Sequence, residues 1–323
     1  MKALILGGAG FIGLHLARSL LADGHRVTLV DDFSRGRDDA DLASVDAEVL
    51  HADLTVPADY RRIPHGWDQV YLLAAVVGVR NVERDPARVI RVNTLAVLNA
   101  LDWIRPGERL FFASTSEVYA GGVSVGTVPV PTPENVPLTV RDVTAPRFAY
   151  GVSKMLGEAA VVHTARARGI PCVIGRFHNV YGPRMGEAHV IPEVALRALR
   201  GEDPFRVYGA EQSRAFCHVD DAVDAVRRLM MPGVADGRIV HIGNDREETA
   251  VADLTKLVLR VVGHDPEITY APAPPGSVAR RCPDLRLLRS LTGYEPAVRL
   301  EDGVRDTVAW YARGRAAGHA RAG

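Results

Sequence analysis

The sequence feature that most constrains the fold is a glycine-rich turn near the N-terminus, between an apolar run and a helical pattern. The apolar run covers residues 2–6, glycines follow as Gly7, Gly8, Gly10 and Gly13, and apolar residues then recur at helical spacing. Because glycine lacks a Cβ, such a turn bends tightly and lets its backbone approach a pyrophosphate, which the N–H groups of the helix N-terminus attract. The last glycine allows the helix to pack closely against the strand, so we expect the strand, turn and helix of a dinucleotide site.

A carboxylate at the end of the second expected strand indicates which dinucleotide binds. This strand, residues 25–30, ends at Asp31. A carboxylate roughly 20 residues beyond the glycines holds the adenosine ribose hydroxyls in dinucleotide folds. Its charge would repel a 2′-phosphate, so NAD is favoured over NADP. The alternatives are that Asp31 and Asp32 only cap a turn, and that Arg35 and Arg37 make NADP a minor option.

Further strands and helices alternate along the first half of the chain, which predicts a doubly wound parallel α/β sheet. The expected elements are strands at residues 48–54, 70–75 and 109–114 and a helix at residues 86–103. The third strand ends at Asp53, which would accept the amino protons of adenine or would equally well belong to a surface turn. The fourth strand ends in small residues, including Ala74, that suit a backbone passing close to a cofactor.

A tyrosine and a lysine share one face of a later expected helix, which runs from about residue 150 to 169. Tyr150 and Lys154 are four positions apart. An ammonium near a phenol favours the phenolate and lowers the pKa of the tyrosine. Such a tyrosine can remove a hydroxyl proton while hydride leaves the same carbon. Thr115, at the end of the fifth strand, could hydrogen-bond that hydroxyl, whereas the alternative is a chance surface pair.

The composition of the chain indicates which classes of protein and which kinds of binding partner can be expected. The 323 residues suffice for one large domain or two lobes, and the formal net charge is zero. No basic stripe with interleaved aromatic residues indicates nucleic acid, and no apolar segment reaches the ~20 residues of a membrane helix. The chain begins directly with a strand, so we expect no signal peptide. The three cysteines and eleven histidines lack ligand spacing, which predicts no metal site and a reduced cytoplasmic protein.

Together with later motifs, these features resemble the extended short-chain dehydrogenases/reductases, in the nucleotide-sugar epimerase, dehydratase and decarboxylase group. The later matching segments are residues 176–184, 212–221 and 281–284, so the resemblance covers nearly the whole chain. It implies a Rossmann-type sheet with a smaller mixed α/β substrate lobe. The division it implies is an NAD-binding domain at 1–175 with a return segment at about 213–243, a substrate lobe at 176–212 and 244–313, and a frayed tail at 314–323.

The resemblance also implies the site residues and a homodimer formed through the helices at 86–103 and 150–169. The cofactor-binding set is Gly7, Gly10, Phe11, Ile12, Gly13, Asp31, Asp32, Asp53, Leu54, Ala74, Asn93, Tyr150 and Lys154. Asn179 would hydrogen-bond a sugar or phosphate oxygen, and Arg214 and Arg281 are guanidinium forks suited to a diphosphate. A carboxylate substrate would need a cation, which Arg184, Arg214 or Arg80 would supply.

Members of this group share a first step, in which the tyrosine and NAD oxidise the sugar at C4. Epimerases then return the hydride to the other face, dehydratases eliminate the C6 hydroxyl, and decarboxylases lose carbon dioxide. Glu117 would lie near the C5–C6 end of the sugar and would complete a catalytic set with Thr115, Tyr150 and Lys154. The trio at 115–117 resembles both UDP-glucuronate decarboxylases and GDP-mannose 4,6-dehydratases, whereas residues 181–185 and 212–216 look more like the decarboxylases.

The sequence departs from that pattern at three places around the expected sugar site. Residues 75–81 lack the Pro- and Tyr-bearing loop of the decarboxylases, residue 178 is His where the family usually has Phe, and the loop at 123–137 is peculiar to this chain. Three hypotheses follow. The first is an enzyme in which Glu117 helps convert C5 or C6, with decarboxylation ahead of dehydration. The second is a 4-epimerase in which Glu117 only orients Ser116 or a water, and the third is a non-catalytic NAD-binding protein.

Overall fold

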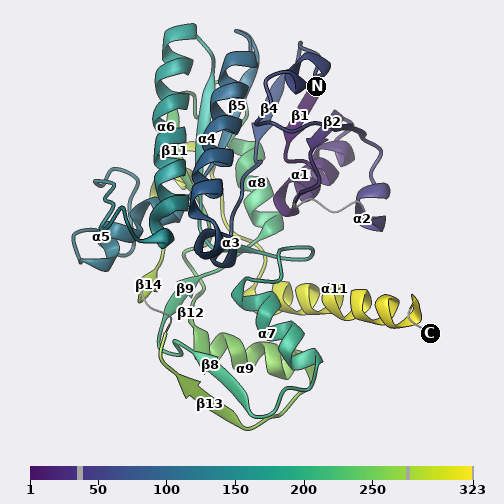
Figure 1. The fold of residues 1–323 in the computed structure, drawn as a ribbon, viewed down its shortest axis with the longest axis vertical. Helices are drawn as coiled ribbons and strands as arrows, with labels where there is room; N and C mark the ends of the chain where they lie inside the picture. Colours follow the sequence, from purple (N-terminus) through teal and green to yellow (C-terminus); the bar gives the residue numbers. More distant parts are fainter. Residues whose placement is uncertain (35–38, 274–276, 322–323) are drawn as a thin grey trace.

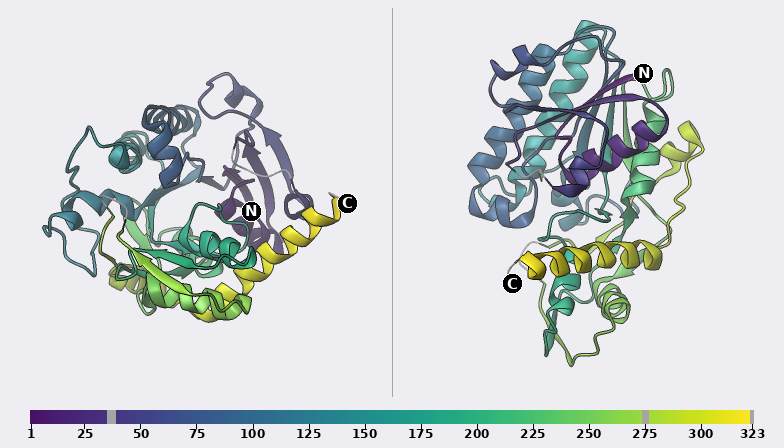
Figure 2. Two further views of the ribbon diagram at one scale, coloured as in Figure 1. Left: turned by 60° about the horizontal axis from the view of Figure 1, so that its bottom comes forward. Right: turned by 90° about the vertical axis from the view of Figure 1, so that its right-hand side faces the viewer.

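The computed structural model describes residues 1–34, 39–273 and 277–321 of the chain. It has two lobes, a larger one built on a parallel sheet and a smaller one beneath it in Figure 1. The C-terminal helix lies between the two lobes, as the right-hand view of Figure 2 shows. The candidate site therefore has to be sought where the sheet faces the smaller lobe.

Seven parallel strands form the central sheet, as the alternating sequence pattern predicts. In their order across the sheet they are β11 (Arg238–Ile242), β6 (Cys172–Phe177), β5 (Arg109–Thr115), β4 (Gln69–Leu72), β1 (Lys2–Leu6), β2 (Arg26–Asp31) and β3 (Glu48–His51). The strand order reverses direction between β1 and β4. Ligands of open α/β sheets bind at such a switch point, outside the carboxyl ends of the strands.

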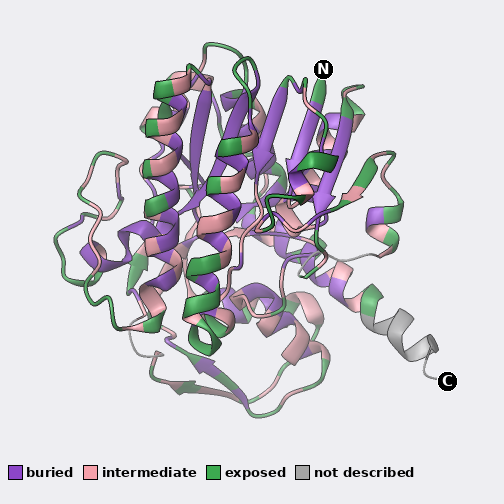
Figure 3. Ribbon diagram, turned by 45° about the horizontal axis from the view of Figure 1, so that its top comes forward, coloured by how far each residue is buried: buried purple, intermediate pink, exposed green. Residues whose placement is uncertain are grey.

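Helices cover both faces of this sheet. One face carries α4 (Pro86–Trp103) and α6 (Ala149–Arg168), whose apolar sides pack on the strands with Val97, Leu101 and Val161 in the core. The other face carries α1 (Phe11–Ala22), α8 (Val219–Leu229) and α10 (Arg286–Thr292). Figure 3 shows the strands buried between these layers. The short helical elements are α2 (Ala40–Ala43), α3 (Val79–Arg84), α5 (Ala120–Ser124) and three 3-10 turns, at Asp59–Arg62, Ser116–Tyr119 and Pro146–Phe148.

The smaller lobe has its own apolar core, which includes Ile191, Phe205, Leu254 and Val304. Its helices are α7 (Val190–Leu199), α9 (Val251–Val262) and α11 (Leu300–Arg321). Its strands pair as β8 (Phe205–Tyr208) with β13 (Ile268–Ala271), and as β12 (Glu248–Ala250), β9 (Ser213–Ala215) and β14 (Arg280–Arg281) in one small sheet. A short pair, β7 (Val180–Tyr181) and β10 (Cys217–His218), lies where the chain passes between the lobes.

Several boundaries differ from those expected. Strands β3 and β4 end at His51 and Leu72, before the polar or small residues expected at their ends. The loop at 123–137 overlaps the end of α5, and the tail expected to fray from 314 continues α11 through Arg321, where alanine and arginine favour helix. Arg35 and Arg37, the basis of the NADP option, lie outside the described residues.

The described residues form neither a membrane span nor a metal-binding cluster. No helix in this part of the chain is long and apolar enough to cross a membrane. Nor do the residues that the structure describes include a group of three or more His, Cys, Asp or Glu placed to hold a metal ion.

Candidate active site

The glycine-rich turn lies at the switch point of the sheet, and its glycines are required by close contacts. Gly7 has φ of +90°, and a Cβ on it would lie 2.6 Å from the backbone nitrogen of Ala74 at the end of β4. A Cβ on Gly13 would lie 2.4 Å from the carbonyl oxygen of Gly7. Phe11 and Ile12 begin α1 and pack partly against the core. The turn is thus shaped as a dinucleotide-binding turn requires.

Asp31 holds this turn in place while keeping capacity for a ligand. Its carboxylate accepts hydrogen bonds from the backbone N–H of Ala9 at 3.0 Å and of Phe33 at 2.9 Å. Burial raises the pKa of Asp31, and the two backbone N–H groups oppose that rise. A carboxylate has about four acceptor sites, so two remain for ribose hydroxyls.

Three other residues of the expected cofactor-binding set, Asp32, Asp53 and Leu54, contact other residues of the protein. Asp32 accepts hydrogen bonds from Ser34, and Asp53 accepts them from Thr55, so both cap turns. Leu54 is buried in the core. These hydrogen bonds are compatible both with turn capping and with cofactor binding by Asp32 and Asp53, because a carboxylate accepts several hydrogen bonds.

Asn93 supports the site from behind. It is buried on α4, accepts from the backbone N–H of Val76 at 2.7 Å, and donates to the Val76 carbonyl and to Ser153 Oγ. Ser153 in turn donates to the carbonyl of Tyr150 at 2.7 Å. Asn93 therefore joins α4, α6 and the segment after β4, which positions the tyrosine-bearing helix beside the cofactor edge.

Tyr150, Lys154 and Thr115 come from α6 and the end of β5. Lys154 is only 2 % exposed and donates to the carbonyl of Ala113 at 2.8 Å, and its Nζ lies 6.0 Å from the centre of the Tyr150 ring. Burial lowers the pKa of Lys154 to about 8. Thr115 is buried, and its Oγ1 accepts from the backbone N–H of Glu117 at 3.2 Å. The arrangement can remove a proton from a substrate hydroxyl at the edge of the sheet.

Glu117 connects the two lobes through an ion pair. It lies on the helical turn after β5, and its Oε1 accepts a hydrogen bond from Arg281 Nη1 on β14. Its other oxygen lies 3.7 Å from Arg147 Nη2. Burial disfavours ionisation of Glu117, but the charge and hydrogen bond of Arg281, together with the charges of Arg147 and Arg214, outweigh it, so the pKa of this carboxyl is below its ordinary value. Arg147 is a site residue that the sequence analysis missed, although it lies one helical turn before Tyr150.

Arg214 adds a third guanidinium group to this cluster. It pairs in register with Arg281 across β9 and β14, and it donates to the carbonyls of Ser213, Val278 and Ala279. Burial and then the nearby Arg281 lower the pKa of Arg214 to about 10. Three guanidinium groups thus surround one carboxylate, which leaves positive charge available to an anionic ligand.

Arg184 has a different place from the one expected for a substrate-binding residue. Its Nη1 donates to the carbonyl of Ala9 at 2.7 Å, and its Nε and Nη2 bond Asp39 at 3.1 and 3.0 Å. The side chain is buried between the glycine-rich turn and the segment before α2. This contact joins the smaller lobe to the cofactor turn, which no local sequence signal indicated.

We expect replacement of Arg184 by Met to weaken NAD binding. The change removes charge-assisted hydrogen bonds to the turn, which are worth about 1.5–3 kcal/mol each, so the affinity for NAD should fall at least about tenfold. Calorimetric titration with NAD measures this, and Arg206→Met, an exposed arginine on β8, is the control. Unchanged NAD affinity in Arg184→Met would show that the contact does not support the cofactor site.

Two other candidates lie at the edge of the site. Asn179 has φ of 42° and donates to the carbonyl of Ala215 at 3.0 Å, which fixes it beside β9. Arg80 is exposed on α3 and is not part of the cluster around Glu117.

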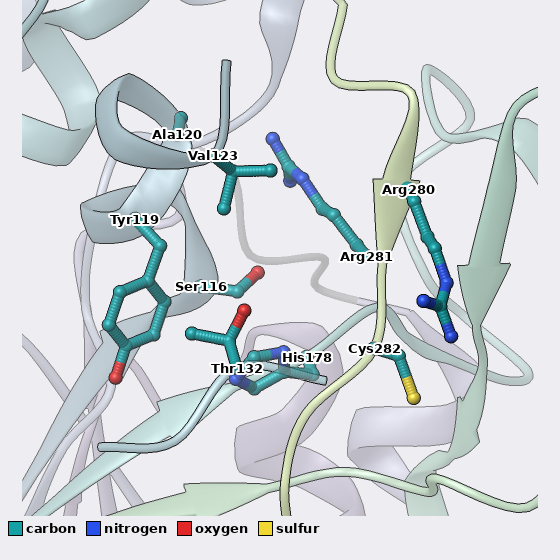
Figure 4. A pocket seen from close by; sticks show the side chains of 9 residues that line it. All are labelled: Ser116, Tyr119, Ala120, Val123, Thr132, His178, Arg280, Arg281 and Cys282. Carbon is teal, nitrogen blue, oxygen red and sulfur yellow. The ribbon is translucent and has the colours of Figure 1, made fainter. Parts of the chain in front are cut away.

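A pocket adjoins the Glu117–Arg281 pair. It is lined by Ser116, Tyr119, Ala120, Val123, Thr132, His178, Arg280, Arg281 and Cys282 (Figure 4). Behind it lies a buried polar network in which Tyr119 Oη is 2.7 Å from His241 Nε2 and accepts from Arg176, which also pairs with Glu158. Sequence reasoning missed this network, because it joins residues from separate strands.

Comparisons with known proteins agree with this geometry. The sequence model of the NAD dependent epimerase/dehydratase family matches residues 3–243. UDP-glucuronic acid decarboxylase 1 of Xenopus tropicalis is 34% identical over 317 residues, which are 96% of this chain and 72% of the relative. UDP-N-acetyl-alpha-D-glucosaminuronate decarboxylase of Bacillus cytotoxicus is 31% identical over 96% of this chain and 97% of its own length. Among solved structures, UDP-glucose 4-epimerase of Thermotoga maritima superposes with a TM-score of 0.85 at 32% identity, over 98% of this chain and all of the other.

Proposed function

The chain belongs to the NAD-dependent epimerase/dehydratase family, and we propose that it is a decarboxylase that removes the C6 carboxylate of a nucleotide-linked uronic acid such as UDP-glucuronate. It is an NAD-dependent enzyme that modifies nucleotide sugars. The observation that carries the proposal is the ion pair of Glu117 with Arg281. Glu117 lies two residues after Thr115, so this pair adjoins the residue expected to bind the C4 hydroxyl. The names of the decarboxylase relatives support the choice of a uridine nucleotide.

The charge around Glu117 favours an anionic sugar. Arg147, Arg214 and Arg281 provide three cations against one carboxylate, and burial strengthens their attraction for anions. A diphosphate and a sugar carboxylate would both be stabilised there. Replacement of a carboxylate by a neutral hydroxymethyl group removes one of these attractions, so a uronate fits the cluster better than a hexose.

In the proposed reaction, Tyr150 removes the proton of the C4 hydroxyl while the Lys154 ammonium stabilises the phenolate. NAD, which the glycine-rich turn and Asp31 would hold, would supply the hydride acceptor for C4 and the hydride donor for the later reduction. The resulting C4 ketone makes the C6 carboxylate part of a β-keto acid. The C5–C6 bond then breaks, its electron pair enters the C4 enolate, and carbon dioxide leaves. Tyr150 and Thr115 would hydrogen-bond the enolate oxygen, and the Glu117–Arg281 pair would direct the proton that returns to C5.

Two other reactions begin with the same oxidation. The similarity to the Thermotoga maritima structure favours 4-epimerisation as the second candidate, in which Glu117 has no chemical role. Elimination of the C6 hydroxyl, as in a 4,6-dehydratase, is the third. The presence of Thr115, Tyr150 and Lys154 around one edge of the sheet argues against a non-catalytic NAD-binding protein.

Product masses distinguish these reactions. The purified enzyme is incubated with NAD and a panel of nucleotide sugars that includes UDP-glucuronate. Loss of carbon dioxide supports the proposal and loss of water indicates a dehydratase. An unchanged mass with a new retention time indicates an epimerase.

We further propose that the two lobes divide the binding of the two ligands. Residues 1–175 with the segment at about 213–243 would hold NAD, and residues 176–212 and 244–313 would hold the nucleotide sugar. Strand β11 lies in the first part, and α7, α9 and Arg281 lie in the second, but two elements depart from this division: β9 (Ser213–Ala215) pairs within the smaller lobe and α10 (Arg286–Thr292) packs on the larger one. Residues 314–321 continue α11. The Glu117–Arg281 pair would then form across the boundary where the reacting carbons lie.

A homodimer through α4 and α6 is also proposed. The two helices pack side by side, and they expose Ile90, Leu98 and Leu156 by 41, 41 and 47 %. Large apolar side chains left exposed on a pair of packed helices favour an interaction surface there.

Replacing Leu98 with Glu should convert the proposed dimer to a monomer, because a charge would have to be buried in the interface. Light scattering at micromolar concentration measures the mass. Tyr270→Glu on β13, an exposed position in the smaller lobe, should leave it unchanged. A wild-type monomer would contradict the proposal.

A cytoplasmic location is proposed from the cysteines. Cys172, Cys217 and Cys282 are all buried and unpaired thiols, as is usual in a reducing compartment. Fractionation of the producing cells with an antibody to the chain tests this, and recovery outside the cytoplasm would contradict it.

A further inference from the structure

His178 is a buried histidine whose ring has unused hydrogen-bonding capacity. It directly follows β6 and is only 2 % exposed. Neither Nδ1 nor Nε2 has a hydrogen-bond partner among the residues that the structure describes. Leaving buried polar atoms unpaired costs about 1–3 kcal/mol, so a ligand that pairs with them would gain that free energy.

The ring is held in a fixed position and in its neutral form. It packs edge-on against His241, with ring centres 4.5 Å apart, and its backbone N–H donates to the carbonyl of Ile242. Burial lowers the pKa of His178 well below its ordinary value, and the charges of Arg281 and Arg176 lower it further. A neutral imidazole offers one N–H donor and one acceptor nitrogen.

The ring lies at the pocket that adjoins Glu117. Figure 4 shows His178 beside the hydroxyl groups of Ser116 and Thr132, with Arg281 on the opposite strand. The cavity volume of this pocket is only about 10 Å³. That is about the space that one water molecule needs, so the pocket suits a single oxygen of a sugar substituent and not a whole sugar.

The wall beside His178 is fixed by the loop peculiar to this chain. The backbone N–H of Thr132 donates to the carbonyl of Cys282 at 2.9 Å, and Asp284 N–H donates to Thr132 O at 2.8 Å. The Thr132 hydroxyl donates a hydrogen bond to the carbonyl of Pro129. The loop is thus joined to the strand that carries Arg281, and the pocket keeps its shape.

We propose that His178 is a specificity-determining residue that donates a hydrogen bond to an oxygen of the C6 substituent, so that this pocket selects sugars with a C6 carboxylate. The inference rests on the proposed function, because it takes the sugar end beside Ser116 and Glu117 to be C6. The positive charge of Arg281 at the pocket favours a carboxylate over a hydroxyl there. A phenylalanine at this position would fill the same space without supplying the donor.

Binding of three ligands that differ only at C6 tests this inference. They are UDP-glucuronate with a carboxylate, UDP-glucose with a hydroxymethyl group, and UDP-xylose with no C6 atom. Titration calorimetry in a Tyr150→Phe background, with NAD present, prevents turnover during the measurement. The variants are His178→Phe and His178→Gln, and His218→Phe is the control, since His218 is 3 % exposed and its Nε2 likewise has no hydrogen-bond partner within the described residues.

We expect His178→Phe to weaken UDP-glucuronate binding by roughly 10- to 100-fold, as loss of one hydrogen bond to a charged group predicts, and UDP-glucose binding by roughly 2- to 10-fold. Binding of UDP-xylose should not change. His178→Gln, which keeps a donor, should retain most of the affinity, and His218→Phe should leave the ratios between the ligands unaltered.

Equal losses for all three ligands, or no loss for UDP-glucuronate, would overturn the inference and leave His178 a structural residue or the partner of a buried water only. Wild-type affinity for UDP-xylose equal to that for UDP-glucuronate would also contradict it. Because binding is measured without turnover, a failure of the decarboxylase proposal appears in the product masses and not here.

Discussion

Replacing Glu117 with Gln should slow formation of the decarboxylated product, because the proton that returns to C5 is no longer directed, while oxidation of the sugar at C4 remains measurable. The substitution keeps the shape of the side chain but removes its charge and its ability to transfer a proton. General acid–base groups contribute about 10²- to 10⁴-fold, so product formation should fall by that factor. Loss of the charge also leaves Arg281 unpaired near the substrate. The absorbance of reduced NAD measures the first step, which is oxidation at C4, and the product mass measures the second, which is loss of C6.

A matched control lies in the smaller lobe. Glu202 pairs with Arg197 as Glu117 pairs with Arg281, and Glu202→Gln weakens that pair at residues that do not line the pocket beside Glu117. This variant should keep nearly full activity. Unchanged product formation in Glu117→Gln would make Glu117 a residue that only orients its neighbours, and would favour the 4-epimerase.

Replacing Tyr150 with Phe should stop every step, including oxidation at C4. The phenol oxygen is the base that takes the C4 hydroxyl proton. Phenylalanine has no oxygen that could accept this proton. We expect a loss of about 10²- to 10⁴-fold in both NAD reduction and product formation, with NAD still bound. Stopped-flow absorbance of reduced NAD measures the first of these.

The control for this substitution is Tyr208→Phe, an exposed tyrosine on β8. It removes a phenol oxygen with little change in packing and should not affect the rate. Full activity in Tyr150→Phe would contradict every catalytic assignment made for this chain, including those of Lys154 and Thr115.

The parts of the fold that the sequence predicts are those that depend on local patterns. The helix at 86–103 begins at a proline and has an apolar stripe, and its bounds agree with α4. The glycine-rich turn, the parallel sheet and the return of residues 239–243 to that sheet also agree. Strand ends were less well predicted, because Asp53 is engaged in a turn with Thr55 and β3 stops before it.

The contacts that shape the site depend on residues far apart in the sequence. Arg184 bonds the carbonyl of Ala9, which is 175 positions away. The identity of a basic residue does not reveal its partner in the fold. The sequence therefore predicts the same substrate-binding role for Arg184 and for Arg281. Likewise, Asn93 gives no sequence signal that it joins Val76 and Ser153. Periodicity predicts which face of a helix is buried, but not which polar atom it meets there.

The most direct test of the central claim follows the C6 carbon itself. UDP-glucuronate labelled with ¹³C at C6 is incubated with the wild-type enzyme and NAD, and the label is measured in gas and in product. The proposal predicts that the label leaves as carbon dioxide and that the remaining product is a nucleotide pentose without it. A converted nucleotide sugar that still holds the label at C6 would contradict decarboxylation and assign the chain to the epimerases or dehydratases of its family.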